Sequence, residues 1–340
     1  MTPSLPDLQA TAAARFEDLR RQGTPGCVVG IAIDGERSVR PLGTADLRNG
    51  APMRVDMAMR IGSVSKLVVA GVIDALAGQG ALQWPDRLSA HLPEVPDSAA
   101  FSLDALGKHR TGYRDALENP AFRRRYNQNP AAAFPIEDVL AASLSQPRLK
   151  LRPGTSRYAN VNAILLALTA ERATGEPYPA LAERLVLRPA RADLRADPTS
   201  AGRSARGYRH GRISGVVEHG AAFFEATKFN PSWAGPAGDL SGNMQALLRL
   251  GASLKPLFAA APKAPAPLQA PAYWRLISLW RNGAGHAGDV PGYSAFLGCS
   301  RDGRLLVGVL SNLSNLANGR APATEIAATL FERWRSGGRP

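Results

Sequence analysis

The order of the predicted elements constrains the fold of this 340-residue chain more than any other feature. An amphipathic helix over residues 8–21 precedes an apolar strand over 27–33, and Asp34-Gly35 marks a tight turn into a second strand. More elements are predicted near the other end of the chain: strands over 273–280, 294–300 and 305–310, and an amphipathic helix over 324–335. The sheet must therefore be assembled from both ends of the chain.

Helices dominate between these strands. Residues 64–77 form a helix that is apolar on nearly all sides, which is typical of a buried, central helix. Helices are also predicted over 136–144, 161–174 and 244–254, whereas the Pro- and Ala-rich residues 259–272 read as an extended surface loop. We predict the α/β (α+β) class: one domain over 1–340, with an α/β lobe at about 8–83 and 236–336 and a mostly helical lobe inserted at about 84–235.

Composition excludes several classes of protein. With 45% hydrophobic and 20% charged residues, the chain can bury a core that a disordered chain cannot. Its longest apolar runs, residues 27–33 and 67–77, are far shorter than the roughly 20 residues of a bilayer span, so no membrane partner is expected. Two cysteines, Cys27 and Cys299, exclude a disulfide-rich scaffold, and their apolar surroundings favour core positions.

The net charge of +13 bears on the possible partners. Beyond residues 123–125 no long basic run occurs, and no basic helix is interleaved with aromatic residues, so no nucleic-acid partner is expected. The charge would suit a small anionic substrate or an acidic carrier protein. Residues 1–22 lack the apolar segment of a signal peptide, which predicts a cytoplasmic location. The oligomeric state is left open.

A serine and a lysine three residues apart provide the first chemical signal. Ser63 and Lys66 share one face of the predicted central helix, so the amine can reach the hydroxyl. Ser63 lies in the first turn, where free backbone N–H groups favour developing negative charge. A lysine in a buried helix loses hydration, which lowers its pKa. The alternative is a helix-capping serine with a lysine that extends to solvent.

Two further segments carry candidate site residues. Tyr158 and Asn160 stand directly before the predicted helix at 161–174, where a phenol next to a protonated lysine could serve as a base and an amide could hold the lysine or a substrate. His286 and Gly288 belong to a glycine-rich stretch that allows close approach of a substrate, and backbone N–H groups there could complete an oxyanion site with that of Ser63. Each segment taken singly also fits a purely structural role.

Together these motifs resemble the serine beta-lactamase and penicillin-binding-protein superfamily, in the branch that contains class C beta-lactamases, D-aminopeptidases, DD-carboxypeptidases and family VIII esterases. The resemblance covers nearly the whole chain. It rests on Arg60-Ile61-Gly62-Ser63-Val64-Ser65-Lys66, on His109-Arg110-Thr111-Gly112, on Tyr158-Ala159-Asn160 and on residues 285–293, in the family order. It implies an antiparallel sheet flanked by helices, with the helical lobe inserted.

The resemblance also implies roles for individual residues. Ser63 would be the acylated nucleophile, Lys66 its proton partner and Tyr158 the main general base and acid. Asn160, His286 and Gly288 would orient the substrate, and the backbone N–H groups of Ser63 and Asp289 would form the oxyanion hole. The turn at residues 109–112 is expected to be structural. No metal or cofactor is expected, because the chemistry is two-step acyl transfer.

One departure from the family pattern shapes the functional hypothesis. His286-Ala287-Gly288 stands where many beta-lactamases and peptidases carry Lys-Thr-Gly, so a point charge for a substrate carboxylate is missing. The leading hypothesis is therefore an esterase for small ester or amide substrates. The alternatives are an acyltransferase or thioesterase-like cyclase with a carrier-bound acyl group, a D-aminopeptidase- or DD-peptidase-like hydrolase, and a catalytically silent ligand-binding protein on the same fold.

Overall fold

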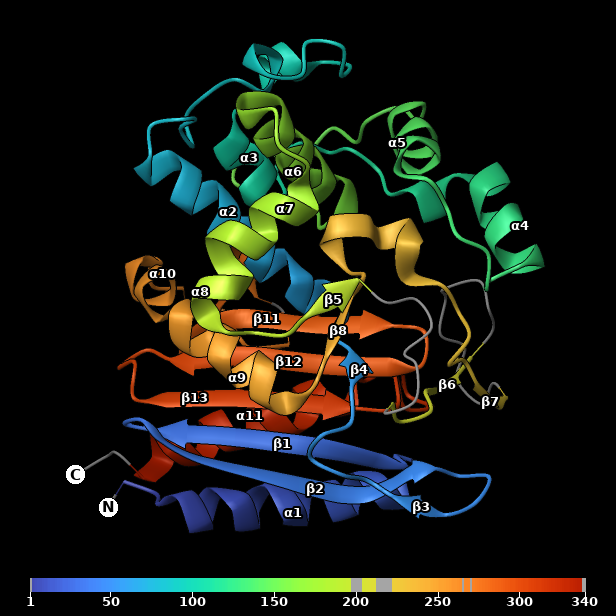
Figure 1. The fold of residues 1–340 in the computed structure, drawn as a ribbon, viewed down its shortest axis with the longest axis vertical. Helices are drawn as coiled ribbons and strands as arrows, with labels where there is room; N and C mark the ends of the chain where they lie inside the picture. The colour runs from blue at the N-terminus through green and yellow to red at the C-terminus, as the bar shows by residue number, and fades with distance from the viewer. Residues whose placement is uncertain (1, 197–203, 212–221, 265, 270, 338–340) are drawn as a thin grey trace.

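Eight antiparallel strands from the two ends of the chain form the central sheet (Figure 1). The computed structural model describes residues 2–196, 204–211, 222–264, 266–269 and 271–337. The strand order is β3-β2-β1-β13-β12-β11-β10-β9, so the first and last long strands, β1 and β13, are neighbours. The bounds are β1 Gly26–Ile33, β2 Glu36–Asp46, β3 Ala51–Pro52, β9 Ala272–Trp274, β10 Ile277–Trp280, β11 Gly283–Val290, β12 Tyr293–Ser300 and β13 Leu305–Ser311. The predicted assembly of the sheet from both chain ends is confirmed.

Two terminal helices cover one face of this sheet. Helix α1 (Leu5–Arg21) packs on β1 and β2, helix α11 (Pro322–Gly337) packs on β12 and β13, and the two helices contact each other. Their apolar sides join those of the strands in one buried cluster, which includes Phe16, Val29, Val309 and Phe331. The apolar residues that recur at helical spacing in α1 and α11 are thus the ones that face the sheet.

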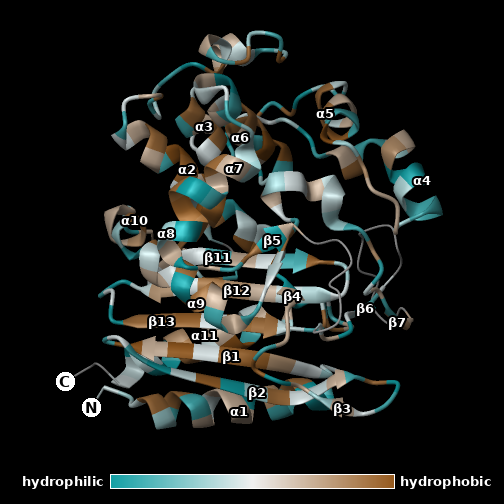
Figure 2. Cartoon of the chain, in the orientation of Figure 1, coloured by the Kyte–Doolittle hydropathy of each residue, from teal (hydrophilic) through white to brown (hydrophobic). Residues whose placement is uncertain are grey.

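A larger core lies on the other face of the sheet. Helix α9 (Met244–Ser253) packs on β1, β12 and β13, and helix α2 (Lys66–Gly78) extends from the sheet into the helical part of the molecule. Figure 2 shows α2 as one of the most hydrophobic elements, together with β1 and β13. Its side chains from Leu67 to Val69 are fully buried. The all-round apolar pattern of this helix therefore reflects its position between two layers.

The middle of the chain forms the helices above the sheet in Figure 1. They are α3 Leu103–Gly107, α4 Pro120–Gln128, α5 Ile136–Leu144, α6 Asn160–Thr174, α7 Tyr178–Ala182, a π turn at Glu183–Leu187 and α8 Arg188–Ala190. Short strands accompany them: β4 Met59–Arg60, β5 Arg195–Ala196 and β8 Leu240–Gly242 in one small sheet, and β6 Tyr208–His210 with β7 Phe223–Glu225 in another. The 3-10 turn Pro231–Ala237 contacts α2 and α6.

One local prediction was wrong, and the loop predicted over 259–272 is shorter at both ends. Residues 273–280 do not form one strand: β9 and β10 form a hairpin whose two turn residues, Arg275 and Leu276, have φ angles of 48° and 63°. Neither residue type is typical of such a turn, so the hairpin could not be predicted from these residues. The region 259–272 begins as the end of helix α10 (Lys255–Ala260) and ends in β9, and its loop is tied to the sheet by Arg281 N–H donating to Ala266 O at 2.8 Å.

Among the helices of the described segments, none combines the length and the apolarity that a membrane crossing requires. Both cysteines are buried and carry free thiols, as their apolar surroundings predicted.

Candidate active site

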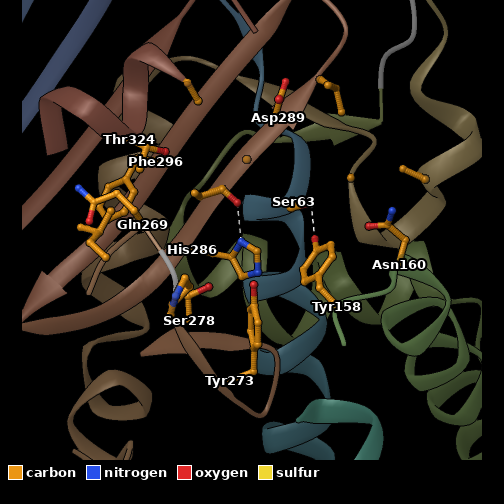
Figure 3. Close-up of a pocket in the computed structure, with 18 of the residues that line it drawn as sticks. Ser63, Tyr158, Asn160, Gln269, Tyr273, Ser278, His286, Asp289, Phe296 and Thr324 are labelled. Atoms are coloured by element: carbon orange, nitrogen blue, oxygen red, sulfur yellow. Dashed lines mark hydrogen bonds between the residues drawn. The ribbon is translucent and has the colours of Figure 1, made fainter. Parts of the chain in front are cut away.

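Ser63 lies on a tight turn that precedes helix α2. The 3-10 turn Gly62–Ser65 leads directly into α2, and Gly62 adopts a positive φ of 50°, which favours glycine. Ser63 is partly exposed and lines a cavity of about 360 Å³, whereas its neighbours Gly62 and Val64 are buried. The hydroxyl is therefore the part of this turn that a ligand in the cavity can reach (Figure 3).

Lys66, the first residue of α2, is completely buried. Its Nζ lies 2.9 Å from Ser63 Oγ, 2.7 Å from Asn160 Oδ1 and 2.9 Å from the carbonyl oxygen of Ala237. Burial lowers the pKa of Lys66, and the negative charge of Asp115 opposes that shift. The amine is thus held against the serine in surroundings that disfavour its charged form.

Tyr158 reaches the same serine from the start of helix α6. Its hydroxyl donates to Ser63 Oγ at 2.6 Å, and its ring lies 4.8 Å from Lys66 Nζ (Figure 3). Desolvation raises the pKa of Tyr158 well above 10, although the hydrogen bond to Ser63 opposes this. Desolvation therefore favours the neutral phenol form of Tyr158.

Asn160 connects the lysine to a carboxylate that the sequence reasoning did not single out. Its Nδ2 donates to Asp115 Oδ2 at 3.1 Å, and the backbone N–H of Val161 donates to Asp115 Oδ1 at 3.1 Å. The carboxylate of Asp115 thus accepts two hydrogen bonds at the N-terminal end of α6. The other end of the Asn160 amide, Oδ1, faces Lys66. The only sequence signal for Asp115 is its spacing of three residues from Glu118, which is that of a capping box.

Strand β11 brings the glycine-rich stretch directly against the nucleophile turn. A methyl group built on Gly288 would lie 2.0 Å from Ile61 O and 3.1 Å from Ser63 N, and one built on Gly62 would lie 2.8 Å from Asp289 N. The backbone nitrogens of Ser63 and Asp289 therefore lie on the same wall of the site, where sequence reasoning expected them. Strand β10 pairs with β11 only as far as Gly285, and no other strand of the described residues pairs with 286–290 on this edge.

His286 lies in the cavity wall as a neutral ring. Burial, together with the nearby positive charge of Lys66, lowers the pKa of His286 to about 3. One ring nitrogen, Nδ1, is hydrogen-bonded to the carbonyl oxygen of Ala287, so Nδ1 carries the proton and Nε2 is an acceptor. His286 is thus not the cation that the lysine of a Lys-Thr-Gly segment would supply.

The turn at residues 109–112 packs behind Tyr158. The His109 ring centroid lies 4.7 Å from that of Tyr158, and His109 Nδ1 accepts from the backbone N–H of Ala159 at 3.4 Å. Thr111 Oγ1 donates to Asn162 Oδ1 at 2.7 Å. These contacts hold the segment that presents Tyr158 and Asn160 to the cavity.

The remaining cavity wall is largely apolar and includes the loop after helix α10. Leu268, Gln269 and Pro271 line the cavity, so this Pro- and Ala-rich segment flanks the site. Trp233 also lines the cavity, as do Trp280 of β10 and Phe296 of β12. Among the described residues that line the cavity, none is lysine or arginine, and Asp289 is the only acidic one. No three histidine, cysteine or acidic side chains of the described segments gather as metal ligands.

Comparison with known proteins identifies the family. The family model described as Beta-lactamase matches residues 12–331. The D-alanyl-D-alanine-carboxypeptidase/endopeptidase AmpH of Escherichia coli (strain K12) is 29% identical over 166 residues, which are 47% of this chain and 42% of AmpH. Esterase EstB of Burkholderia gladioli is 29% identical over 198 residues, 53% of this chain and 50% of EstB. The matched segments thus span about half the length of these relatives.

The fold is also that of solved hydrolase structures. The structure of D-amino acid amidase from Ochrobactrum anthropi SV3, complexed with L-phenylalanine amide, superposes with a TM-score of 0.81 at 19% identity and covers 98% of this chain and 100% of the other. At that identity the match concerns the fold, which agrees with the predicted antiparallel sheet flanked by helices. The chain belongs to the Beta-lactamase family, whose relatives include serine hydrolases that act as esterases, amidases and carboxypeptidases.

Proposed function

We propose that this protein is a serine hydrolase that forms an acyl-enzyme on Ser63 and acts on small, uncharged ester or amide substrates. One observation carries the proposal: Ser63 Oγ lies 2.9 Å from Lys66 Nζ and 2.6 Å from the Tyr158 hydroxyl at the wall of a cavity. A serine becomes a nucleophile when an adjacent group takes its proton as the new bond forms. Both neighbours are within the distance that proton transfer requires.

Lys66 is the group best placed to take that proton. Its other two partners, Asn160 Oδ1 and Ala237 O, can only accept hydrogen bonds. A neutral amine would give both of its hydrogens to these oxygens, and its lone pair would then point toward the Ser63 hydroxyl. Burial favours this neutral form. These two acceptors thus determine the direction of the remaining hydrogen bond, in which the Ser63 hydroxyl donates to the amine of Lys66.

The reaction then proceeds through two acyl transfers. Ser63 Oγ attacks the substrate carbonyl carbon, its proton moves to Lys66, and the carbonyl electrons move onto oxygen, which the N–H groups of Ser63 and Asp289 would stabilise. Collapse of this intermediate breaks the bond to the leaving group, which Tyr158 protonates. The phenolate regains a proton from the Lys66 ammonium. Water repeats the sequence on the acyl-enzyme, which releases the acid and restores Ser63.

The cavity supports an uncharged substrate. No described lining residue is lysine or arginine, and the buried His286 is neutral at physiological pH, so a substrate carboxylate would lose hydration without gaining a counter-charge. Asp289, which also lines the cavity, adds repulsion in its ionised form, although burial raises its pKa to about 7. A volume of about 360 Å³ is at the lower end for ligand pockets, which suits a small acyl group. These features favour an esterase over a DD-peptidase- or beta-lactamase-like hydrolase.

A matched pair of substrates tests this specificity. We expect p-nitrophenyl butyrate to be hydrolysed faster than the p-nitrophenyl monoester of succinate, because the two share a leaving group and differ in the charge of the acyl chain. Faster hydrolysis of the succinate would contradict the uncharged substrate class. A peptide ending in D-alanyl-D-alanine, assayed beside its amide, extends the comparison to the peptidase alternative.

Acyl transfer to an acceptor other than water is the second candidate, favoured by the net charge of +13, which would suit an acidic carrier protein. An acyl-enzyme that persists in water but is released by an added amine, or a carrier-bound thioester that turns over faster than a small thioester, would favour this candidate. A well-folded protein that forms no acyl-enzyme with any ester would instead favour a silent ligand-binding role.

A further inference from the structure

We propose that Asp115 is a positioning residue of this site: it fixes the amide of Asn160 and supplies the negative charge that Lys66 faces through that amide. The inference rests on the proposed role of Lys66 as the acceptor of the Ser63 proton. The spacing of the motifs does not assign a part to this carboxylate.

Asp115 is held in place by contacts that do not involve the catalytic groups. Its backbone N–H donates to Glu118 Oε1 at 3.2 Å, and its carbonyl oxygen accepts from Gln146 Nε2 at 3.0 Å. The turn Ala116–Glu118 follows directly. The backbone that carries Asp115 is therefore fixed, and its carboxylate can act as a reference point for the side chain of Asn160.

The hydrogen bonds of the carboxylate decide which way the Asn160 amide points. An ionised carboxylate only accepts, so the two oxygens of Asp115 take the Nδ2 of Asn160 and the backbone N–H of Val161. Asn160 Oδ1 must then face the other way, toward Lys66 Nζ at 2.7 Å. Without the carboxylate, the amide is free to rotate and present its own N–H groups to the lysine.

The charge of Asp115 acts in the same direction. Tyr158 and the two buried rings His109 and His286 also face Lys66, and all three are neutral at physiological pH. Glu118 lies nearby, but Arg114 and Arg157 are paired with it at 3.3 and 2.9 Å. Asp115 is thus the carboxylate whose charge opposes the loss of the proton from Lys66. It sits at the N-terminal end of α6, where negative charge is favoured.

The test measures how the reactivity of Ser63 depends on pH. A fluorophosphonate reports on the nucleophile without knowledge of the substrate, because Ser63 Oγ displaces fluoride from phosphorus. The labelling rate rises with pH as Lys66 loses its proton. In Asp115→Asn the charge is gone and the Asn160 amide can turn, so the rising limb moves to lower pH by about one unit, and the maximal rate falls.

Two further variants separate this role from a structural one. Glu118→Gln removes a carboxylate from the same turn and keeps an acceptor for the Asp115 backbone, so its limb stays at the wild-type pH. The double variant Asp115→Asn/Asn160→Asp exchanges the amide and the carboxylate. It can form the same hydrogen bonds among these two side chains, Val161 N–H and Lys66, but the carboxylate then contacts Lys66 directly. Its limb moves above the wild-type pH, and this isosteric exchange carries the test where the single variant folds poorly.

The proposal would be overturned if the labelling rate rose at the wild-type pH in both Asp115→Asn and the exchange variant. A lower rate would not rescue it, because loss of a helix cap alone would lower the rate at every pH. A limb that shifts equally in Glu118→Gln would also overturn it. Ser63→Ala serves as the blank: labelling of this variant would refute the proposed nucleophile itself, whereas an unlabelled blank with unmoved limbs removes only the role of Asp115.

Discussion

Replacing Gly288 by alanine would insert a methyl group into the wall that holds the nucleophile. The new Cβ would lie 2.0 Å from the carbonyl oxygen of Ile61, 3.0 Å from its carbon and 3.1 Å from the nitrogen of Ser63. All three contacts are to backbone, so no side chain can rotate away to relieve them. Strand β11 is fixed on its other side by pairing with β12, and the turn at Ser63 continues into a buried helix.

The size of the displacement sets the size of the effect. A carbon–oxygen contact at 2.0 Å must open by more than 1 Å to reach an ordinary separation of about 3.5 Å. A displacement of about 1 Å at a reacting centre costs about 100-fold in rate, and loss of one oxyanion donor costs about 100- to 1,000-fold. We therefore expect Gly288→Ala to lower kcat/KM for p-nitrophenyl butyrate at least 100-fold, with about 1–3 kcal/mol lost from the free energy of unfolding.

The matched control is Gly78→Ala, at the end of the helix α2 that follows the Ser63 turn. A methyl group built on Gly78 meets nothing within 4 Å. We expect this variant to keep the wild-type kcat/KM, because alanine suits a helix and fills open space. Ester hydrolysis is followed by absorbance, and urea unfolding reports the stability of each variant. A Gly288→Ala protein with activity within tenfold of wild type would refute the inference that β11 and the Ser63 turn jointly form the catalytic wall.

Three other predictions follow from the same contacts. Tyr158→Phe keeps the ring against His109 but removes the proton donor, so ester hydrolysis should fall about 100- to 10,000-fold at unchanged thermal stability; a loss below tenfold would exclude Tyr158 as the acid. The wild-type labelling rate should rise with pH through a limb below the ordinary lysine pKa of 10.5, since the neutral amine is active and burial lowers its pKa; a rate that falls with rising pH would reverse that assignment. Glu325→Gln should cost about 1–2 kcal/mol in urea unfolding, because this buried carboxylate pairs with the partly buried Arg15 and the exposed Arg320; an unchanged midpoint would show that the pairs add no stability.

The sequence predicted the framework of the fold because its signals there are local. The strand at Gly26–Ile33 and the helices α1, α2 and α11 follow from apolar runs and periods, and the sheet built from both ends follows from their order. The spacing of Ser63 and Lys66 likewise fixes their contact on one helix. Tyr158 is 95 residues from Ser63, and Asn160 is 94 residues from Lys66. No local pattern joins such distant residues, so only the resemblance to a family predicted that they share the site.

The sequence could not supply what depends on contacts between distant segments. The sequence suggested a phenol beside a lysine that could serve as a base, but the desolvation that raises the pKa of Tyr158 depends on the assembled site. The carboxylate of Asp115 meets Asn160 across 45 residues, and nothing in its own neighbourhood indicates that contact. The β9–β10 hairpin turns at Arg275 and Leu276, which carry no turn signal, and tertiary pairing imposes their backbone conformation.

The most direct test of the central claim is intact-mass spectrometry after incubation with a fluorophosphonate, with the adduct localised by peptide mapping. We predict one adduct per chain, on Ser63, and none on Ser63→Ala protein that is shown to be folded. An adduct on another residue, an adduct that persists in Ser63→Ala, or no adduct on folded wild-type protein would contradict the assignment of Ser63 as the nucleophile.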